Sequence, residues 1–262
     1  MSSQITYGAE PAKGWRPWAA LVPFLGIAFV AATVISLTAA LQSAHFVDAQ
    51  ENPIGLSGFV VFLLLPFGAL SIVVVAWIRF VERRPLASIG LGGAHRLQTF
   101  LGGQLAGVAM VTAIVAGIWI AGGFDMLALG GALGSPGAIG SIAVLLACFA
   151  VQSGIEEFFF RGWMLSAIAA KFGVVIAVVL SSLVFTFLHF DPRGSWIFVA
   201  NVFLFAAFAC CWAIRTGNVW VSWVGTAHGI GFLPSGSACE SQLSTRTCRL
   251  CSFNSLLSAP II

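Results

Sequence analysis

Long apolar stretches separated by short polar segments recur along the whole chain. About 20 apolar residues in a helix cross the hydrocarbon core of a bilayer, so we take stretches of roughly 18 or more as predicted spans. The pattern predicts six full spans, at Trp18–Leu41, Leu56–Phe80, Phe100–Ala121, Ala138–Ala170, Val174–Phe190 and Trp196–Ile214. A seventh stretch begins at Val219 and stops near Phe232, too early to cross. The prediction is an all-α, polytopic transmembrane helical bundle.

The composition agrees with this class of protein. Of 262 residues, 59% are hydrophobic and 8% charged, and the mean hydropathy is +1.01. A soluble domain carries roughly 25% charged residues, so a water-soluble enzyme, a disordered chain and a collagen are excluded. The net charge of +3 is too small and too scattered to follow a phosphate backbone. The lipid bilayer is therefore an expected partner and nucleic acid is not.

The pattern divides the chain into four parts. Residues 1–17 form a polar N-terminal segment without the features of a cleavable signal peptide, and 18–137 hold the N-terminal transmembrane helices. Residues 138–232 hold the helices that carry intramembrane charge, and 233–262 form a polar tail. Basic residues in alternate loops predict a cytoplasmic N-terminus and a multi-pass protein of the plasma (bacterial inner) membrane.

Two carboxylates and a guanidinium interrupt the fourth predicted span. Glu156, Glu157 and Arg161 lie in an otherwise apolar run, where each charge costs roughly 2.5–3.5 kcal/mol on insertion scales. Glu157 and Arg161 are four residues apart and can pair on one helix face. Glu156 points about 100° away around the helix, which leaves its carboxylate for chemistry. The alternative is a helix end at the membrane interface with all three groups solvated.

A histidine near the end of the fifth predicted span is a partner for Glu156. If the chain turns at Phe172–Gly173, Glu156 and His189 each lie about 16 residues, or roughly 24 Å, from the turn and so at the same depth. Together they can hold and polarise one water, with the carboxylate as general base. They can equally be two ligands of a divalent metal ion such as zinc. A packing role for His189, which shares a helix face with Phe185, is the simpler alternative.

A second histidine lies in the short seventh stretch. His228 follows the run Arg215-Thr216-Gly217-Asn218-Val219-Trp220. An imidazole at this place can donate a hydrogen bond to a developing oxyanion. A solvent-exposed histidine in a frayed segment is the alternative interpretation.

These motifs, in this order, resemble the CAAX-protease and bacteriocin-processing (CPBP, also ABI) family of intramembrane endopeptidases. The resemblance covers residues 138–230 and rests on Glu-Glu-x-x-x-Arg, Phe-x-x-x-His and a late histidine. It implies that Glu156 activates a water that His189 helps to hold, and that Glu157 and Arg161 support the site. It implies an oxyanion site that includes the late histidine, and peptide or lipidated-peptide substrates such as prenylated CAAX or bacteriocin-like peptides. Both a metalloendopeptidase and a metal-free site are compatible with the motifs.

The end of the chain departs from the family pattern. The family has Asn or Asp four residues after the late histidine, whereas this chain has Phe232, whose ring cannot donate a hydrogen bond. The following tail lacks apolar periodicity. We hypothesise a frameshift near residues 222–227, because reading residues 227–233 one base later allows His-x-x-x-Asp.

The sequence is therefore compatible with three classes of function. The first is an intramembrane peptidase, and the second is a proton-coupled transporter, because buried Glu, Arg and His also mark ion paths. Intramembrane charge in only the second half of the chain counts against the transporter. The third is a pseudoenzyme or membrane scaffold, which the incomplete final motif suggests.

Overall fold

The chain folds into apolar helices joined by short turns. A computed structural model describes residues 19–92, 96–123, 135–190, 192, 194–220 and 223. Within these residues it contains no strand, and one isolated bridge pairs Val47 with Pro53. The elements in chain order are α1 (Val22–Ser43), α2 (Gly55–Ala76), η2 (Trp77–Val81), η3 (Leu86–Ile89), α3 (Arg96–Ile120), α4 (Pro136–Glu157), η5 (Phe158–Met164), α5 (Leu165–Phe172), α6 (Val174–Leu188) and α7 (Trp196–Thr216). The all-α polytopic class is thus confirmed.

The number of full spans differs from the prediction. Five described helices are long and apolar enough to cross a membrane, whereas α6 has only 15 residues. The predicted span at 174–190 is shorter because the backbone leaves the helix at His189, whose φ and ψ are −103° and 9°. Of the predicted seventh stretch only Val219, Trp220 and Trp223 are described; the rest of it, with His228, the tail and residues 1–17, lies outside the described residues.

One long helical segment dominates the second half of the molecule. Residues Pro136–Phe172 form 37 continuous helical residues, about 55 Å in length. Ser135 caps its first turn by accepting a hydrogen bond from the Ala138 amide at 3.3 Å. A seven-residue π-helical stretch, η5, joins α4 to α5. Such wider turns are often found at functional sites, and this one follows Glu157 directly.

A tight hairpin follows the long helix, as the sequence predicts. Gly173 has a φ of 84° and separates α5 from α6. Glycine adopts this conformation without the steric cost that a Cβ atom brings. The hairpin brings α6 against α5 and η5, so that the end of α6 can approach the charged turn.

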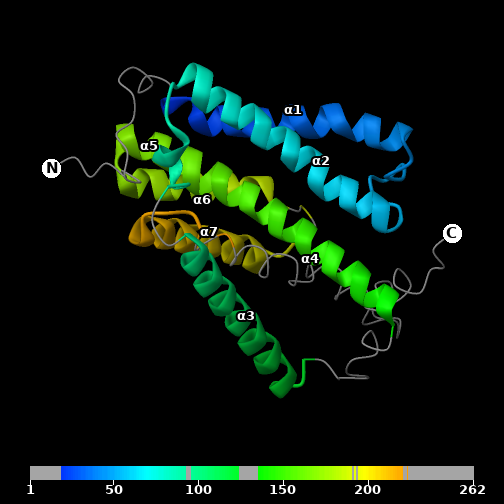
Figure 1. Ribbon diagram of the computed structural model, residues 1–262. Helices are drawn as coiled ribbons and strands as arrows, with labels where there is room; N and C mark the ends of the chain where they lie inside the picture. Colours follow the sequence, from blue (N-terminus) through cyan, green and yellow to red (C-terminus); the bar gives the residue numbers. More distant parts are fainter. Residues whose placement is uncertain are drawn as a thin grey trace.

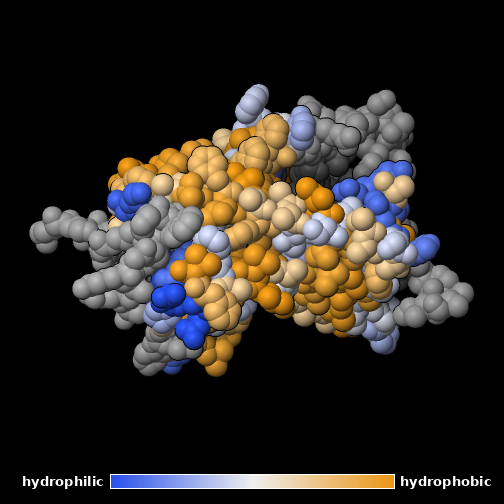
Figure 2. Space-filling model, turned by 90° about the horizontal axis from the view of Figure 1, so that it is seen from above, coloured by the Kyte–Doolittle hydropathy of each residue, from blue (hydrophilic) through white to orange (hydrophobic). Residues whose placement is uncertain are grey.

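The core lies where the π-helical stretch meets its neighbours. Phe159, Trp163, Met164 and Phe185 are all buried within one apolar cluster. In Figure 1, α1 and α2 lie side by side, the long helix crosses the molecule, and α3 diverges from the other helices. Figure 2 shows that apolar residues cover the middle of one face while hydrophilic residues gather toward its two ends. Such an apolar surface fits a lipid environment.

Candidate active site

A fully buried ion pair forms the base of the candidate site. Arg161 Nη1 lies 3.0 Å from Glu157 Oε1, and both side chains have no solvent exposure. Both lie on one face where α4 passes into η5, as the four-residue spacing predicts. Breaking such a buried pair leaves an uncompensated charge, which costs about 3–5 kcal/mol. The pair therefore holds this turn in one arrangement.

Glu156 is also buried but does not share the contacts of Glu157. Its exposure is 6%, and its Oε1 accepts a hydrogen bond from Gln152 Nε2 at 3.1 Å. Gln152 is one helical turn earlier, and sequence reasoning missed it, although the four-residue spacing from Glu156 was visible. The Oε1 atom of Gln152 is buried without a hydrogen-bond partner among the described residues. The neighbourhood of Glu156 thus offers an additional acceptor for a water or a substrate amide.

His189 ends α6 in a defined orientation. Its Nδ1 lies 2.8 Å from the carbonyl oxygen of Phe185. A carbonyl can only accept, so Nδ1 carries the proton and the neutral ring keeps a lone pair on Nε2. The Phe185 ring stacks on the imidazole with centroids 4.2 Å apart. The Phe-x-x-x-His spacing therefore fixes the ring from both its edge and its face.

Arg161 connects the two halves of the site. Its guanidinium carbon lies 4.5 Å from the centre of the Phe185 ring, within the range of a cation–π contact. The structure thus joins Glu157 to Arg161, Arg161 to Phe185 and Phe185 to His189, while Glu156 precedes Glu157 in the chain. The candidate oxyanion residue His228 lies outside the described residues.

An indole covers the turn before the carboxylates. Trp223 Nε1 donates to the carbonyl oxygen of Ala150 at 2.6 Å, and Ser153 Oγ donates to the Trp223 carbonyl. A Cβ atom on Gly154 would collide with the Trp223 ring. Gly154 therefore allows the segment after α7 to lie directly against α4, two residues before Glu156.

The donor groups around Glu156 and His189 do not form a complete metal site among the described residues. Among the described residues, no group of three His, Cys, Asp or Glu side chains could hold a metal ion. A catalytic zinc site uses three protein ligands, so Glu156 and His189 do not complete one by themselves.

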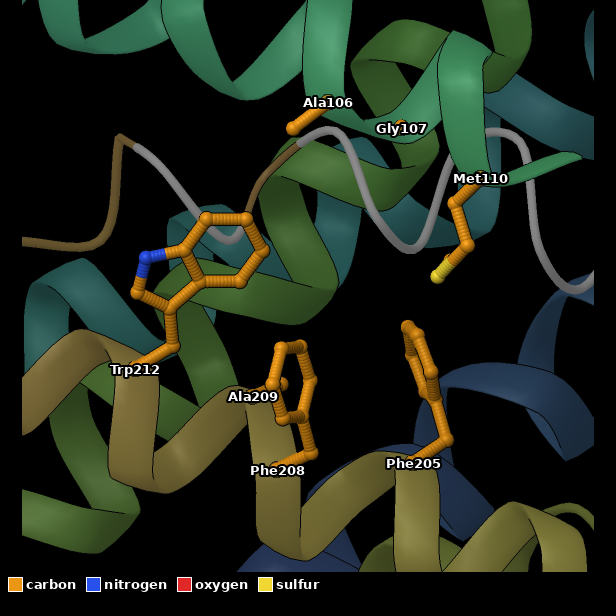
Figure 3. Close-up of a pocket in the computed structure, with 7 residues that line it drawn as sticks. All are labelled: Ala106, Gly107, Met110, Phe205, Phe208, Ala209 and Trp212. Atoms are coloured by element: carbon orange, nitrogen blue, oxygen red, sulfur yellow. The ribbon is translucent and has the colours of Figure 1, made fainter. Parts of the chain in front are cut away.

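Two apolar cavities open beside these elements. One, of about 140 Å³, lies between α3 and α7, and Figure 3 shows Ala106, Gly107 and Met110 facing Phe205, Phe208, Ala209 and Trp212 across it. The other, of about 300 Å³, is lined by Leu97, Phe100, Trp220 and Trp223. Trp223 places the second cavity next to α4, and Ala209 precedes Cys210, whose thiol lies 4.0 Å from Ser182 Oγ on α6. Both cavities are therefore lined by α3, α7 and the segment after α7, which lies beside the elements that carry the site.

The fold and the site together define a multi-pass membrane protein with a buried carboxylate, guanidinium and imidazole cluster. Residues 138–230 match the family of type II CAAX prenyl endopeptidase Rce1-like proteins. This match covers the residues that carry the motifs, and it confirms their resemblance to the CAAX-protease family. No curated protein and no solved structure matches the chain significantly. The family is one of membrane proteases acting on CAAX-type substrates.

Proposed function

We propose that this protein is an intramembrane endopeptidase of the plasma membrane that hydrolyses peptide bonds in or near the bilayer. The proposal is carried by a buried carboxylate outside the ion pair, Glu156, and by His189, whose ring is oriented by the Phe185 carbonyl with its proton on Nδ1. A peptidase that uses water needs a base to remove the water's proton and a second group to hold the water. These two residues supply one function each.

The proposed reaction proceeds in two proton transfers. Glu156 takes a proton from a water that His189 Nε2 helps to hold, and the water oxygen attacks the peptide carbonyl carbon. The C–N bond then breaks, and Glu156 returns the proton to the departing amine nitrogen. The Glu157–Arg161 pair keeps the turn in place, and His228 donates a hydrogen bond to the oxyanion.

We propose lipidated or strongly apolar peptides as substrates, with prenylated CAAX and bacteriocin-like peptides as the two classes to compare. The two apolar cavities along α3 and α7 support this choice, because they place apolar lining next to the helices of the site. An apolar chain leaving water gains roughly 25 cal/mol for each Å² buried.

The test uses the purified full-length chain in lipid vesicles with an internally quenched farnesylated CAAX peptide and its unlipidated counterpart. Glu156→Gln and His189→Ala are expected to lower kcat by about 10²–10⁴-fold, the usual contribution of general acid–base groups. Asn201→Ala is the matched control, because this polar residue of α7 is exposed on the bundle. Cleavage retained by both site variants would contradict the mechanism.

A pseudoenzyme is a second candidate, and Phe232 is the observation that favours it. With phenylalanine four residues after His228, the oxyanion site lacks the amide or carboxyl group of the family pattern. Sequencing the gene from codon 215 onward tests the frameshift hypothesis directly. An indel near codon 226 would restore the peptidase proposal for the intact protein, whereas hydrolysis by the purified 262-residue chain would eliminate the pseudoenzyme.

A further inference from the structure

A second cluster of buried charge lies outside the residues that the motifs point to. Glu82 and Arg84 follow α2, and both are 2% exposed. In the sequence, Val81-Glu82-Arg83-Arg84-Pro85 directly follows the predicted span Leu56–Phe80. In the structure only Arg83 of the three charged residues is exposed. Burying two charges at a loop is costly unless hydrogen bonds satisfy them, so these contacts require a reason.

The contacts of Glu82 reach the long helix. Its Oε1 accepts hydrogen bonds from two indoles, Trp77 Nε1 at 2.9 Å and Trp163 Nε1 at 2.6 Å. Its Oε2 lies 3.1 Å from Arg84 Nη1. Trp163 belongs to η5 and follows Arg161 by two residues, so Glu82 anchors the helix immediately after the site.

Arg84 extends the same connection. Its Nη2 donates to Ser166 Oγ at 2.8 Å and to the Ser88 carbonyl at 3.1 Å, and its Nε donates to Ser88 Oγ at 3.2 Å. Ser166 is the second residue of α5, which begins directly after η5. We name Trp77, Glu82, Arg84, Ser88, Trp163 and Ser166 the Glu82–Arg84 network.

The backbone around this network also touches the site turn. A Cβ atom on Gly162 would lie 2.7 Å from the Ile89 carbonyl oxygen, so the loop contacts the helix directly beside Arg161. The Gly90 carbonyl accepts a hydrogen bond from the Val219 amide at 3.2 Å. The segment from Glu82 to Gly90 therefore contacts both the charged turn and the stretch that leads to Trp223.

Aromatic contacts continue from the network to the histidine. Trp163 contacts Phe159 with ring centroids 5.4 Å apart, and Phe159 contacts Phe160 at 4.8 Å. Phe160 contacts Phe185 at 4.9 Å, and Phe185 stacks on His189. A shift of the Trp163 ring would therefore be passed to the groups that hold the imidazole.

We propose that Glu82 and Arg84 are positioning residues for the site: by holding Trp163 and Ser166, they set the orientation of the turn that carries Glu156, Glu157 and Arg161 relative to α6. This inference rests on the proposed peptidase function. A π-helical stretch changes the rotation of the residues after it, relative to those before it, about the helix axis. Contacts on the residues after the stretch are therefore needed to fix this rotation.

The test compares Arg84→Gln and Trp163→Phe with the matched control Arg83→Gln. Trp163→Phe keeps a buried aromatic ring and removes the indole N–H that donates to Glu82, so it decides the outcome if Arg84→Gln fails to fold. Two quantities are measured in lipid vesicles: kcat and KM on the farnesylated peptide, and the rate at which dicyclohexylcarbodiimide modifies Glu156, followed by mass spectrometry. The second measurement needs no catalysis.

We expect the two network variants to lose about tenfold or more in kcat with KM within about twofold, since a misplacement of about 1 Å can cost 10²-fold. We also expect a changed rate of Glu156 modification in both variants, and wild-type behaviour from Arg83→Gln. A folded Trp163→Phe variant with wild-type kcat and wild-type modification rate overturns the inference, and so does a loss of kcat without any change in modification. If the wild-type chain cleaves nothing, the proposed function fails, and the modification rates alone decide the positioning role.

Discussion

At the residue scale, Phe185 explains why an apolar side chain belongs to a charged site. Its ring stacks on His189 at 4.2 Å and lies 4.5 Å from the Arg161 guanidinium carbon. Its carbonyl oxygen accepts a hydrogen bond from the protonated Nδ1 of the same histidine. One residue thus orients the imidazole and stabilises the cation of the ion pair, two tasks that an aliphatic side chain cannot perform.

Replacing Phe185 with leucine is therefore expected to reduce activity beyond its effect on packing. The backbone carbonyl remains, whereas the stacking and the cation–π contact, each worth about 0.5–2 kcal/mol, are lost. We expect kcat to fall by about tenfold. Phe187→Leu is the control, because Phe187 is on the same helix but 62% exposed. Equal kinetics for the two variants would show that Phe185 only fills the core.

The candidate residues of the site could be predicted from the sequence, whereas the residues that hold them in place could not. The pairs Glu157–Arg161 and Phe185–His189 are four residues apart, so helix geometry alone places each pair on one face. The contact of Trp163 with Glu82 joins residues 81 positions apart, and no local pattern encodes it. From the sequence, an indole in an apolar run is expected to pack in the core. A charged residue at the end of a span is expected to be solvated.

At the element scale, the cavity between α3 and α7 offers a test that distinguishes lipidated from unlipidated substrates. Its lining is apolar, and α3 contributes the small residues Ala106 and Gly107 to it. Ala106→Trp would fill much of this space. If the cavity receives the lipid of a substrate, KM for the farnesylated peptide should rise by about tenfold or more, corresponding to about 1.4 kcal/mol of lost binding, with no change for the unlipidated peptide.

Leu105→Trp is the matched control for this prediction. Leu105 is the neighbouring residue of α3, is 73% exposed, and does not line the cavity. Steady-state kinetics on both peptides separate the outcomes. An equal rise in KM for both peptides in Ala106→Trp would assign the cavity to packing, and unchanged kinetics would place the lipid elsewhere.

The apolar pattern predicted the positions of the helices well, and it predicted their ends less well. The hairpin at Gly173 was predictable because a glycine there interrupts two apolar runs. The end of α6 at Leu188 was not, because Phe190 is as apolar as the helix before it and periodicity gives no stop signal. The π-helical stretch was likewise invisible, because its seven residues read as an ordinary helix.

At the scale of the whole molecule, the short α6 affects how water reaches the site. Its 15 residues span about 22 Å, less than the hydrocarbon core of about 30 Å. With Gly173 at one membrane face, His189 lies below the opposite face, at membrane depth. Non-helical backbone is tolerated there only inside the protein or along a water-filled cavity. The half-buried His189 fits the second case, and the proposed hydrolysis requires such access of water.

The distribution of exposed charge predicts the orientation of the molecule. Arg79, Arg83, Lys171 and Arg215 are exposed at the ends of α2, α5 and α7. Asp48 and Glu51 lie in the loop between α1 and α2, which Figure 1 places at the other end of the molecule from α5. Asn52 and the Gln50 amide donate hydrogen bonds to the Asp48 carboxylate and hold the pKa of this group below its ordinary value, so it remains charged at neutral pH.

The positive-inside rule then places the α5 end in the cytoplasm and the α1–α2 loop outside. In a cysteine-free background, Ala49→Cys should react with a membrane-impermeant maleimide on intact cells, and Lys171→Cys only after permeabilisation. This orientation places the Glu156 level about 24 Å from the cytoplasmic turn, so the substrate bond would have to enter the bilayer to be cut. Labelling of Lys171→Cys on intact cells would invert the molecule, and it would put the end of α6 nearer the cytoplasm, within reach of soluble peptides.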